Sequence, residues 1–181
     1  MFPPVAPKRA LEETPECHVM RFGYTVLYIA LIVFVNWSFD IIPLVDLPGG
    51  EKWPPAAIVT GLIFVARDFA QREIGHRVIF AMLLAGAISY VMAGPVVAGA
   101  SVAAFLVSEF ADWTIYSFTG RRFSDRILIS SAVSTPLDSL VFLYLIGHAS
   151  AVGVAAMTAS KMLGAFLIWW LVRRREAAAV A

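Results

Sequence analysis

The segment Val78–Gly94 reads VIFAMLLAGAISYVMAG and contains no charged residue. A helix needs about 20 mostly apolar residues, and at least roughly 17, to cross a hydrocarbon core about 30 Å thick. The Gly94-Pro95 step marks the end of the segment, because proline suits a turn or the first position of a helix. The segment shows no apolar–polar alternation, and an open sheet would leave unpaired backbone groups in lipid. It therefore predicts a transmembrane helix.

Five more segments of this kind surround the first one. Two of them, 54–74 and 96–119, are less apolar because each contains several charged residues. The sequence therefore predicts an all-α membrane protein, a bundle of six transmembrane helices over residues 22–172, with a disordered tail at 1–21 and a second tail at 173–181. The expected spans are Phe22–Phe39, Pro54–Ile74, Val78–Gly94, Val96–Thr119, Ile127–Gly147 and Ser150–Val172.

The composition of the whole chain supports this fold class. Of the 181 residues, 60% are apolar and only 15% are charged, whereas a soluble domain usually carries about a quarter charged residues. The mean hydropathy is +0.78. The apolar composition makes a lipid bilayer the expected environment. The net charge of +1 gives no indication of a nucleic-acid partner. Cys17 is the only cysteine, which excludes an intrachain disulfide and a CxxC motif.

The distribution of Lys and Arg predicts the orientation. Only Lys52 lies in the loops on one side, and ten basic residues lie on the other side: Lys8, Arg9, Arg21, Arg77, Arg121, Arg122, Arg126, Arg173, Arg174 and Arg175. Basic residues are enriched in cytoplasmic loops. Both termini are therefore expected in the cytoplasm, which requires an even number of spans, and the protein is expected to be a multi-pass protein of the inner membrane.

Eight charged residues remain inside the expected spans. A charge at the centre of a bilayer costs roughly 2.5–3.5 kcal/mol on insertion scales, so intramembrane charges usually face the interior and are paired. Acidic residues are in excess, which favours an interior polar site over a set of structural ion pairs, the alternative interpretation. The eight are Arg67, Arg72 and Lys161 against Asp68, Glu73, Glu109, Asp112 and Asp138.

Depth along each span predicts which charges meet. At 1.5 Å per residue, Asp138 lies about 18 Å along the fifth span and Lys161 about 18 Å along the sixth, so we expect a pair near the midplane. Asp68 and Arg72 share one helix face, as do Glu109, Asp112 and Tyr116. These two faces lie at matching depth, so spans two and four are expected to line a common cavity, while Ile63 is expected to face lipid.

Small residues four apart predict close helix packing. Such spacing lets helix backbones approach each other in lipid. The sequence contains it in Ala81, Ala85 and Ser89, in Gly99 with Ala103, in Ala155 with Ala159, and in Ser160 with Gly164.

The sequence contains none of the common catalytic motifs. There is no phosphate-binding glycine-rich loop and no HExxH motif, and His18, His76 and His148 are far apart. We therefore expect no enzymatic activity, no metal and no cofactor. A membrane-embedded enzyme remains the weakest of the alternatives.

Several charged motifs together resemble the VUT family of vitamin uptake transporters, which includes the queuosine precursor transporters. The resemblance covers most of the chain from Phe22 onward, and this chain has shorter loops and tails than is usual in that family. It rests on RDFAQREIG (67–75), AAFLVSEFAD (103–112) with Tyr116, TPLDS (135–139), Lys161, and Asn36 at the end of the first span.

The resemblance implies six helices and the uptake of a 7-deazaguanine, either 7-cyano-7-deazaguanine (preQ0) or its aminomethyl relative (preQ1). A guanine-like edge offers two adjacent donors to one carboxylate, and its carbonyl oxygen suits Lys, Arg or Asn. Trp113 and Tyr116 are candidates for a stacking face. The residues expected to bind the substrate are Asn36, Arg67, Asp68, Arg72, Glu109, Asp112, Tyr116, Asp138 and Lys161.

A second interpretation of the sequence keeps the six spans but makes the protein one subunit of a larger importer. The chain has the size of a substrate-binding S component of an energy-coupling-factor vitamin importer, which would need a separate ATPase and a scaffold subunit. The chain has no ATP site of its own. Under the first interpretation, transport therefore draws on a gradient or on trapping of the product, and the sequence leaves a homo-oligomer open.

Overall fold

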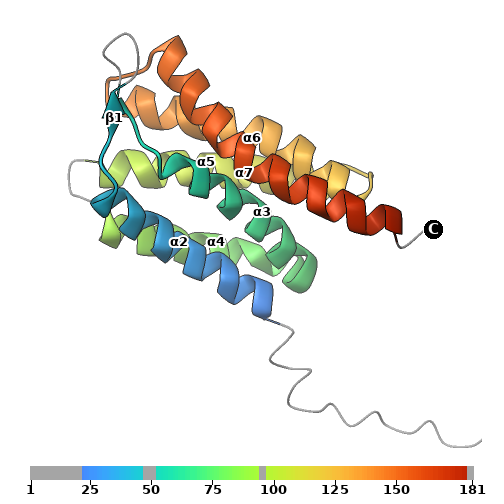
Figure 1. The fold of residues 1–181 in the computed structure, drawn as a ribbon. Helices are drawn as coiled ribbons and strands as arrows, with labels where there is room; N and C mark the ends of the chain where they lie inside the picture. Colours follow the sequence, from blue (N-terminus) through green and yellow to red (C-terminus); the bar gives the residue numbers. More distant parts are fainter. Residues whose placement is uncertain (1–21, 47–51, 94–96, 179–181) are drawn as a thin grey trace, which may run out of the picture.

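The structure, a computed structural model, describes residues 22–46, 52–93 and 97–178 (Figure 1). The expected apolar segments are helical. The helices are α2 (Gly23–Ile41), α3 (Ala57–Ile74), α4 (Val78–Met92), α5 (Ala98–Phe118), α6 (Phe123–Leu145) and α7 (Ala151–Ala178), with a 3-10 turn η1 (Gly75–Arg77) between α3 and α4. The proposed tail at residues 1–21 lies outside the described residues.

Four helical segments of the described chain are long and apolar enough to cross a membrane: 23–41, 57–92, 123–145 and 151–178. The second contains α3 and α4, which are separated at Gly75, where φ is +64°, a conformation that favours glycine. Helix α5 is outside this set, and it carries Glu109 and Asp112. The chain is thus a helical membrane protein, and the crossing of the bilayer by each of α2 to α7 stays a prediction.

The outer surface of the helices has the character of a lipid-facing surface. Phe80 is 74% exposed and Val91 is 83% exposed, and many other large apolar side chains on the helices are also exposed. Soluble monomers rarely expose apolar patches of this extent. The exposed apolar surface therefore agrees with the membrane assignment.

The helices form two layers of three. Helix α3 packs between α2 and α7 in one layer, and α5 packs between α4 and α6 in the other (Figure 1). The layers are joined at their edges, where α2 contacts α4 and α6 contacts α7. The two central helices, α3 and α5, are therefore the best shielded, and each carries two charged residues on its buried side.

Glycines bring α3 and α7 into close contact. A Cβ on Gly61 of α3 would lie 1.9 Å from the backbone oxygen of Lys161 on α7. A Cβ on Gly164 of α7 would lie 2.9 Å from the backbone oxygen of Ile58 on α3. The expected packing role of the Ser160–Gly164 pair is thus confirmed. Among the residues that the structure describes, a Cβ on Gly99 would meet nothing within 4 Å, so the expected packing role of Gly99 is wrong for this part of the chain.

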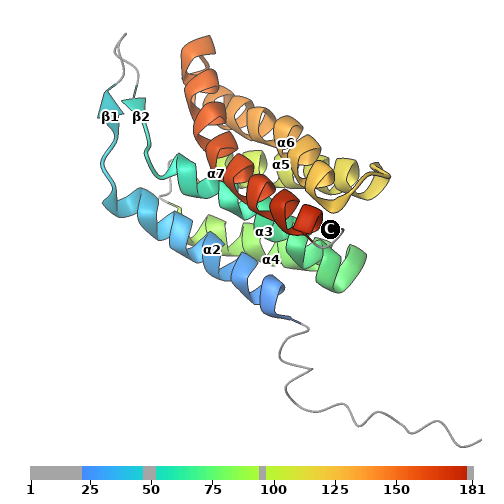
Figure 2. The same cartoon turned by 45° about the vertical axis from the view of Figure 1, so that its right-hand side comes forward.

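The described ends of the chain lie at one end of the bundle, and a short hairpin lies at the other (Figures 1 and 2). Strand β1 (Val45–Asp46) pairs antiparallel with β2 (Lys52–Trp53), an element that the expected all-α fold lacks. The Trp53 indole donates a hydrogen bond of 2.8 Å to Ser160 Oγ, which ties the hairpin to α7.

At the end of the bundle away from the hairpin, polar side chains join the helices. The Glu73 carboxylate accepts hydrogen bonds from the backbone nitrogen and hydroxyl of Thr25 at the start of α2, at 2.9 and 2.8 Å. Glu176 accepts from the Ser124 hydroxyl at 2.6 Å. Helix α7 continues to Ala178, past the expected end of the span at Val172, because its Arg, Glu and Ala residues favour helix.

Candidate functional site

The central helices meet at a closed cluster of four charged side chains, called here the charge cluster. It consists of Arg67 and Asp68 of α3 with Glu109 and Asp112 of α5, and all four side chains are 0% exposed. Arg67 Nη2 lies 3.0 Å from Asp68 Oδ1 and is also paired with Asp112, while Arg67 Nε lies 3.5 Å from Glu109 Oε2. The expectation that α3 and α5 bring these residues together is therefore correct.

Neighbouring polar groups complete the charge cluster. The Tyr28 hydroxyl of α2 donates to Glu109 Oε2 at 3.2 Å, and the Ser130 hydroxyl of α6 donates to Asp68 Oδ2 at 3.2 Å. Arg67 also donates to the Gln71 side chain. Four helices thus converge on this point, and the expected cavity between α3 and α5 is replaced by direct ion pairs.

The charge cluster is not balanced. One guanidinium faces three carboxyl groups, so full ionisation would leave two uncompensated negative charges in a site that water does not reach. Asp68 Oδ1 and Asp112 Oδ2 contact only the Arg67 guanidinium, and Glu109 Oε1 and Asp112 Oδ1 have no partner in the described part of the protein. Buried charge without full compensation costs several kcal/mol per ion even after relaxation. The charge cluster is therefore poised to take up a positively charged species.

Tyr116 and Arg72 lie beside the charge cluster. Tyr116 is buried, and its ring lies 5.8 Å from the Arg67 guanidinium and 3.8 Å from that of Arg126. Arg72 is exposed and lies over the Phe123 ring at 4.7 Å. The expectation that Arg72 joins Asp68 in the interior site is therefore wrong, because the Arg72 side chain is exposed and its guanidinium covers the Phe123 ring.

A second pair of charges lies on the other side of the central helices. Lys161 of α7 donates to Asp138 of α6, as the depth along the spans predicts, and it also donates to Ser139 Oγ at 3.0 Å. The other Asp138 oxygen accepts from the Ser108 hydroxyl of α5 at 3.2 Å. Lys161 is buried, whereas Asp138 is 13% exposed because it faces a cavity.

The cavity beside Asp138 has a volume of about 270 Å³. Its walls come from all six helices, and it contains both members of the Asp138–Lys161 pair. Its other polar side chains are Asn36, Asp40, Thr60, Ser89 and Ser101, and its aromatic rings are Phe39, Phe105 and Phe142. The size is just below that of typical small-molecule sites, roughly 300–1,000 Å³.

Asn36 is held in place within this cavity. Its amide nitrogen donates to the Ile32 carbonyl oxygen at 2.8 Å, and its Oδ1 accepts from the Ser89 hydroxyl at 3.2 Å. Ile63, which was expected to face lipid, is 4% exposed and also lines the cavity. Trp113, a candidate for stacking, instead packs edge-on against His76 with ring centroids 5.7 Å apart.

The nine residues proposed from the sequence thus separate into three groups. Asn36, Asp138 and Lys161 line the cavity; Arg67, Asp68, Glu109 and Asp112 form the closed charge cluster, with Tyr116 beside it; Arg72 lies outside both. Sequence reasoning missed Thr60, Ser89, Ser101 and the three Phe rings. The only signal for Ser89 was its place in the repeat of small residues, where it was expected to serve packing.

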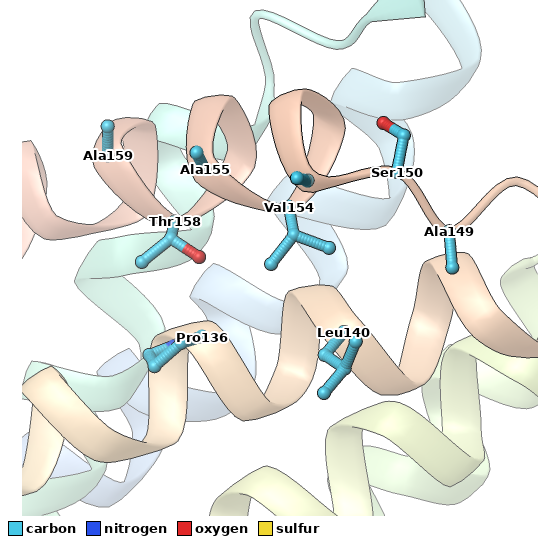
Figure 3. A pocket seen from close by; sticks show the side chains of 9 residues that line it. Pro136, Leu140, Ala149, Ser150, Val154, Ala155, Thr158 and Ala159 are labelled. Atoms are coloured by element: carbon cyan, nitrogen blue, oxygen red, sulfur yellow. The ribbon is translucent and has the colours of Figure 1, made fainter.

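A larger groove of about 650 Å³ runs between α6 and α7 at the start of α7 (Figure 3). Leu140 and Pro136 of α6 face Val154 and Thr158 of α7 across it, and most of its lining is apolar. Leu140 is largely exposed, so this groove lies on the outer surface of the bundle. It carries no charged side chain, and it has the chemistry of a surface that contacts lipid chains.

Within the described part of the chain, no group of His, Cys, Asp and Glu is arranged to hold a metal ion. The side chains that remain as candidates for binding are therefore those of the cavity and of the charge cluster. No protein-family model, curated protein or solved structure matches this chain.

Proposed function

We propose that this protein is a six-span importer of the inner membrane that takes up a queuosine precursor, preQ0 or preQ1, through the cavity beside Asp138. The observation that carries the proposal is the Asp138–Lys161 pair on the wall of a cavity of about 270 Å³. The motif resemblance of the sequence to the VUT family supports the choice of substrate.

The Asp138–Lys161 pair complements the edge of a guanine-like base. That edge presents a carbonyl oxygen followed by two N–H donors. Lys161 supplies a donor for the carbonyl oxygen, and the Asp138 carboxylate supplies two adjacent acceptors. In the ligand-free protein these groups bind each other, Ser108 and Ser139. A bound base would replace those contacts with hydrogen bonds to its own edge. The affinity for the base therefore depends on the hydrogen-bonding groups of that edge as well as on the area that the base buries.

The remaining walls of the cavity suit a flat heterocycle. Phe39, Phe105 and Phe142 provide apolar faces for the ring system, because aromatic rings stabilise one another by stacking beyond the area they bury. Asn36, fixed by Ser89, offers an amide to the rim of the base. The two precursors differ only in the substituent at position 7 of the deazaguanine. This substituent would then point toward the unfilled part of the cavity.

The position of the cavity supports uptake from outside as the proposed direction of transport. It is lined by the last turns of α2 and α4 and the first turns of α5, which lie toward the hairpin end of the bundle. The charge bias predicts that this end faces outward. The charge cluster closes the path between α3 and α5 toward the other end. The base would therefore enter the cavity from outside and bind there while the cytoplasmic half of the bundle is closed.

Uptake by a host that lacks its own precursor synthesis and its own importer tests this proposal. Expression of this protein is expected to restore queuosine in tRNA when preQ0 or preQ1 is supplied in the medium. The purified protein alone in proteoliposomes is expected to exchange labelled preQ0 or preQ1. Transport by the protein alone also separates the proposal from the energy-coupling-factor alternative. A correctly inserted protein that handles neither precursor would contradict the substrate assignment.

A double variant isolates the role of the cavity pair. Asp138→Asn with Lys161→Met removes both charges together, so the fold is expected to persist while precursor uptake is lost. Losing one charge-assisted hydrogen bond costs roughly 1.5–3 kcal/mol, or about 10- to 150-fold in affinity. The control is Asp46→Asn, which removes an exposed carboxylate of β1 and is expected to transport normally. Unchanged uptake by the double variant would remove the pair from the binding site.

A further inference from the structure

We propose that the charge cluster is a proton-binding site, that Glu109 holds the proton, and that this proton is carried with the substrate. The site is distinct from the cavity, because none of the four cluster residues lines it. The transport half of the inference rests on the proposed function. The proton-binding half concerns the protein alone and can be tested without a substrate.

The first argument is charge. One guanidinium cannot balance three ionised carboxylates, and all four side chains are fully buried. A proton removes one of the two uncompensated negative charges and needs no additional space, whereas a metal ion needs several oxygen ligands arranged around it. Two carboxyl oxygens of the cluster, Glu109 Oε1 and Asp112 Oδ1, have neither a hydrogen-bond donor nor an ion-pair contact in the described structure. These oxygens are the available positions for a proton.

The second argument is the unequal compensation of the three carboxyl groups. Asp112 is in direct contact with Arg67, and Asp68 lies 3.0 Å from it and also accepts a hydrogen bond from Ser130. Glu109 lies farther from the guanidinium, at 3.5 Å, and its Oε1 has no donor. Glu109 is therefore the carboxylate that Arg67 compensates least.

The groups that face Glu109 support the same assignment. Tyr28 of α2 donates to its Oε2, Arg67 is its only close cation in the described structure, and Asp112 and Asp138 add negative charge from α5 and α6. Helix α4, which also packs against α5, contains no charged residue. The surroundings of Glu109 thus contain more negative than positive charge, which favours the neutral acid.

The position of Glu109 links the proton to the substrate. Its neighbour along α5, Ser108, donates to Asp138 on the cavity wall, so one hydrogen bond connects the residue beside the proton site to the proposed base site. In the closed form seen here, the neutral acid lets α3 and α5 pack together. Opening of the cytoplasmic half of the bundle would bring water to Glu109. The Glu109 O–H bond would then break, and water would carry the proton into the cytoplasm. Base and proton would leave on the same side.

The test without substrate uses purified protein. A folded state that holds more protons than the unfolded state loses stability as the pH rises, so the wild-type Tm is expected to fall from acidic to alkaline pH. Glu109→Gln is expected to flatten this fall. Asp125→Asn, which removes a partly exposed carboxylate paired with Arg173, is expected to keep the wild-type slope. Equal slopes for wild type and Glu109→Gln would overturn the inference.

Infrared spectroscopy of the wild type keeps the test valid if Glu109→Gln does not fold. A protonated carboxyl group has a C=O stretch that an ionised carboxylate lacks. The wild type at neutral pH is expected to show this band and to lose it at alkaline pH. Absence of the band at neutral pH would overturn the proton site without reference to any variant.

The transport test separates coupling from substrate recognition. Proteoliposomes with the membrane potential clamped at zero are given labelled preQ0, which is uncharged. A pH gradient of one unit, alkaline inside, is expected to drive about tenfold accumulation if one proton moves with each base. Glu109→Gln is expected to keep exchange of labelled for unlabelled preQ0 but to lose accumulation.

Two outcomes overturn different claims. Wild-type exchange that continues with no response to the pH gradient, or that responds to sodium instead, would contradict proton coupling and leave the proposed function standing. Failure of the wild type to exchange either precursor would contradict the proposed function. The proton site would then stand or fall on the Tm and infrared measurements.

Discussion

Asp138 and Lys161 are two single charges on different helices, and each compensates the other in the middle of the bundle. Removing one member of a buried pair leaves an uncompensated charge and typically costs about 3–5 kcal/mol, whereas removing both is often neutral. We therefore expect Asp138→Asn and Lys161→Met each to reduce the amount of folded protein. The double variant is expected to recover most of it.

The wild type, the two single variants and the double variant are purified from equal amounts of membrane. Size-exclusion chromatography measures the amount of folded protein, and thermal unfolding gives the Tm of each. The single variants are expected to give less monodisperse protein and a lower Tm than the wild type. The double variant is the internal control, since it carries both substitutions. If the single variants are as stable as the wild type, the two side chains do not form the pair described here.

The pair also shows what sequence can predict at the scale of single residues. Depth follows from counting along a helix, so it predicts that Asp138 meets Lys161. Rotation about the helix axis does not follow from counting. For that reason Ile63 was assigned to lipid although it lines the cavity, and Arg72 was assigned to the interior although it covers Phe123.

At the scale of helices, Gly61 decides how closely α3 approaches α7. A Cβ at this position would lie 1.9 Å from the Lys161 carbonyl oxygen and 2.7 Å from its carbonyl carbon, and both atoms belong to the backbone. Backbone atoms move only with their helix, so Gly61→Ala must separate α3 from α7. Overpacking of this kind typically costs about 1–3 kcal/mol.

Gly61→Ala is expected to lower the Tm and to reduce precursor uptake, because Lys161 moves with its backbone. The matched control is Gly99→Ala, since an added Cβ there meets nothing within 4 Å. It is expected to behave as the wild type in both measurements. A normal Tm for Gly61→Ala would show that α3 and α7 are not in direct backbone contact.

The helices were predictable from the sequence, and the hairpin was not. Most of the helices are long apolar runs, and length with apolarity is a strong signal, whereas α5 is less apolar because it carries Glu109 and Asp112. Strands β1 and β2 have two residues each, which is too short for any alternation to appear. Their pairing and the bond from Trp53 to Ser160 depend on contacts between distant parts of the chain.

At the scale of the whole molecule, the two-layer arrangement places the most charged spans at its centre. The sequence predicted that α3 and α5 meet, because only mutual contact compensates their charges at the same depth. It did not predict which helices lie at the edges, because α2 and α4 lack a mid-span charge that would indicate a buried face. Nor did it place the cavity, which depends on side chains from every helix.

The arrangement makes a prediction about orientation. The start of α2 and the end of α7 lie at one end of the bundle, and the hairpin lies at the other (Figures 1 and 2). The basic loops belong to the first end, so the positive-inside rule places that end in the cytoplasm. Single cysteines can test this after Cys17→Ser removes the native thiol, the only one in the chain.

Gly50→Cys, in the loop between β1 and β2, is expected to react with a membrane-impermeant maleimide added to intact cells. Arg121→Cys, between α5 and α6, is expected to react only after the cells are opened. The two positions have opposite expected outcomes, so each is the control for the other. If Arg121→Cys is labelled from outside and Gly50→Cys is not, the bundle is inverted. The proposed cavity would then face the cytoplasm, and the direct entry of a precursor from outside would no longer follow.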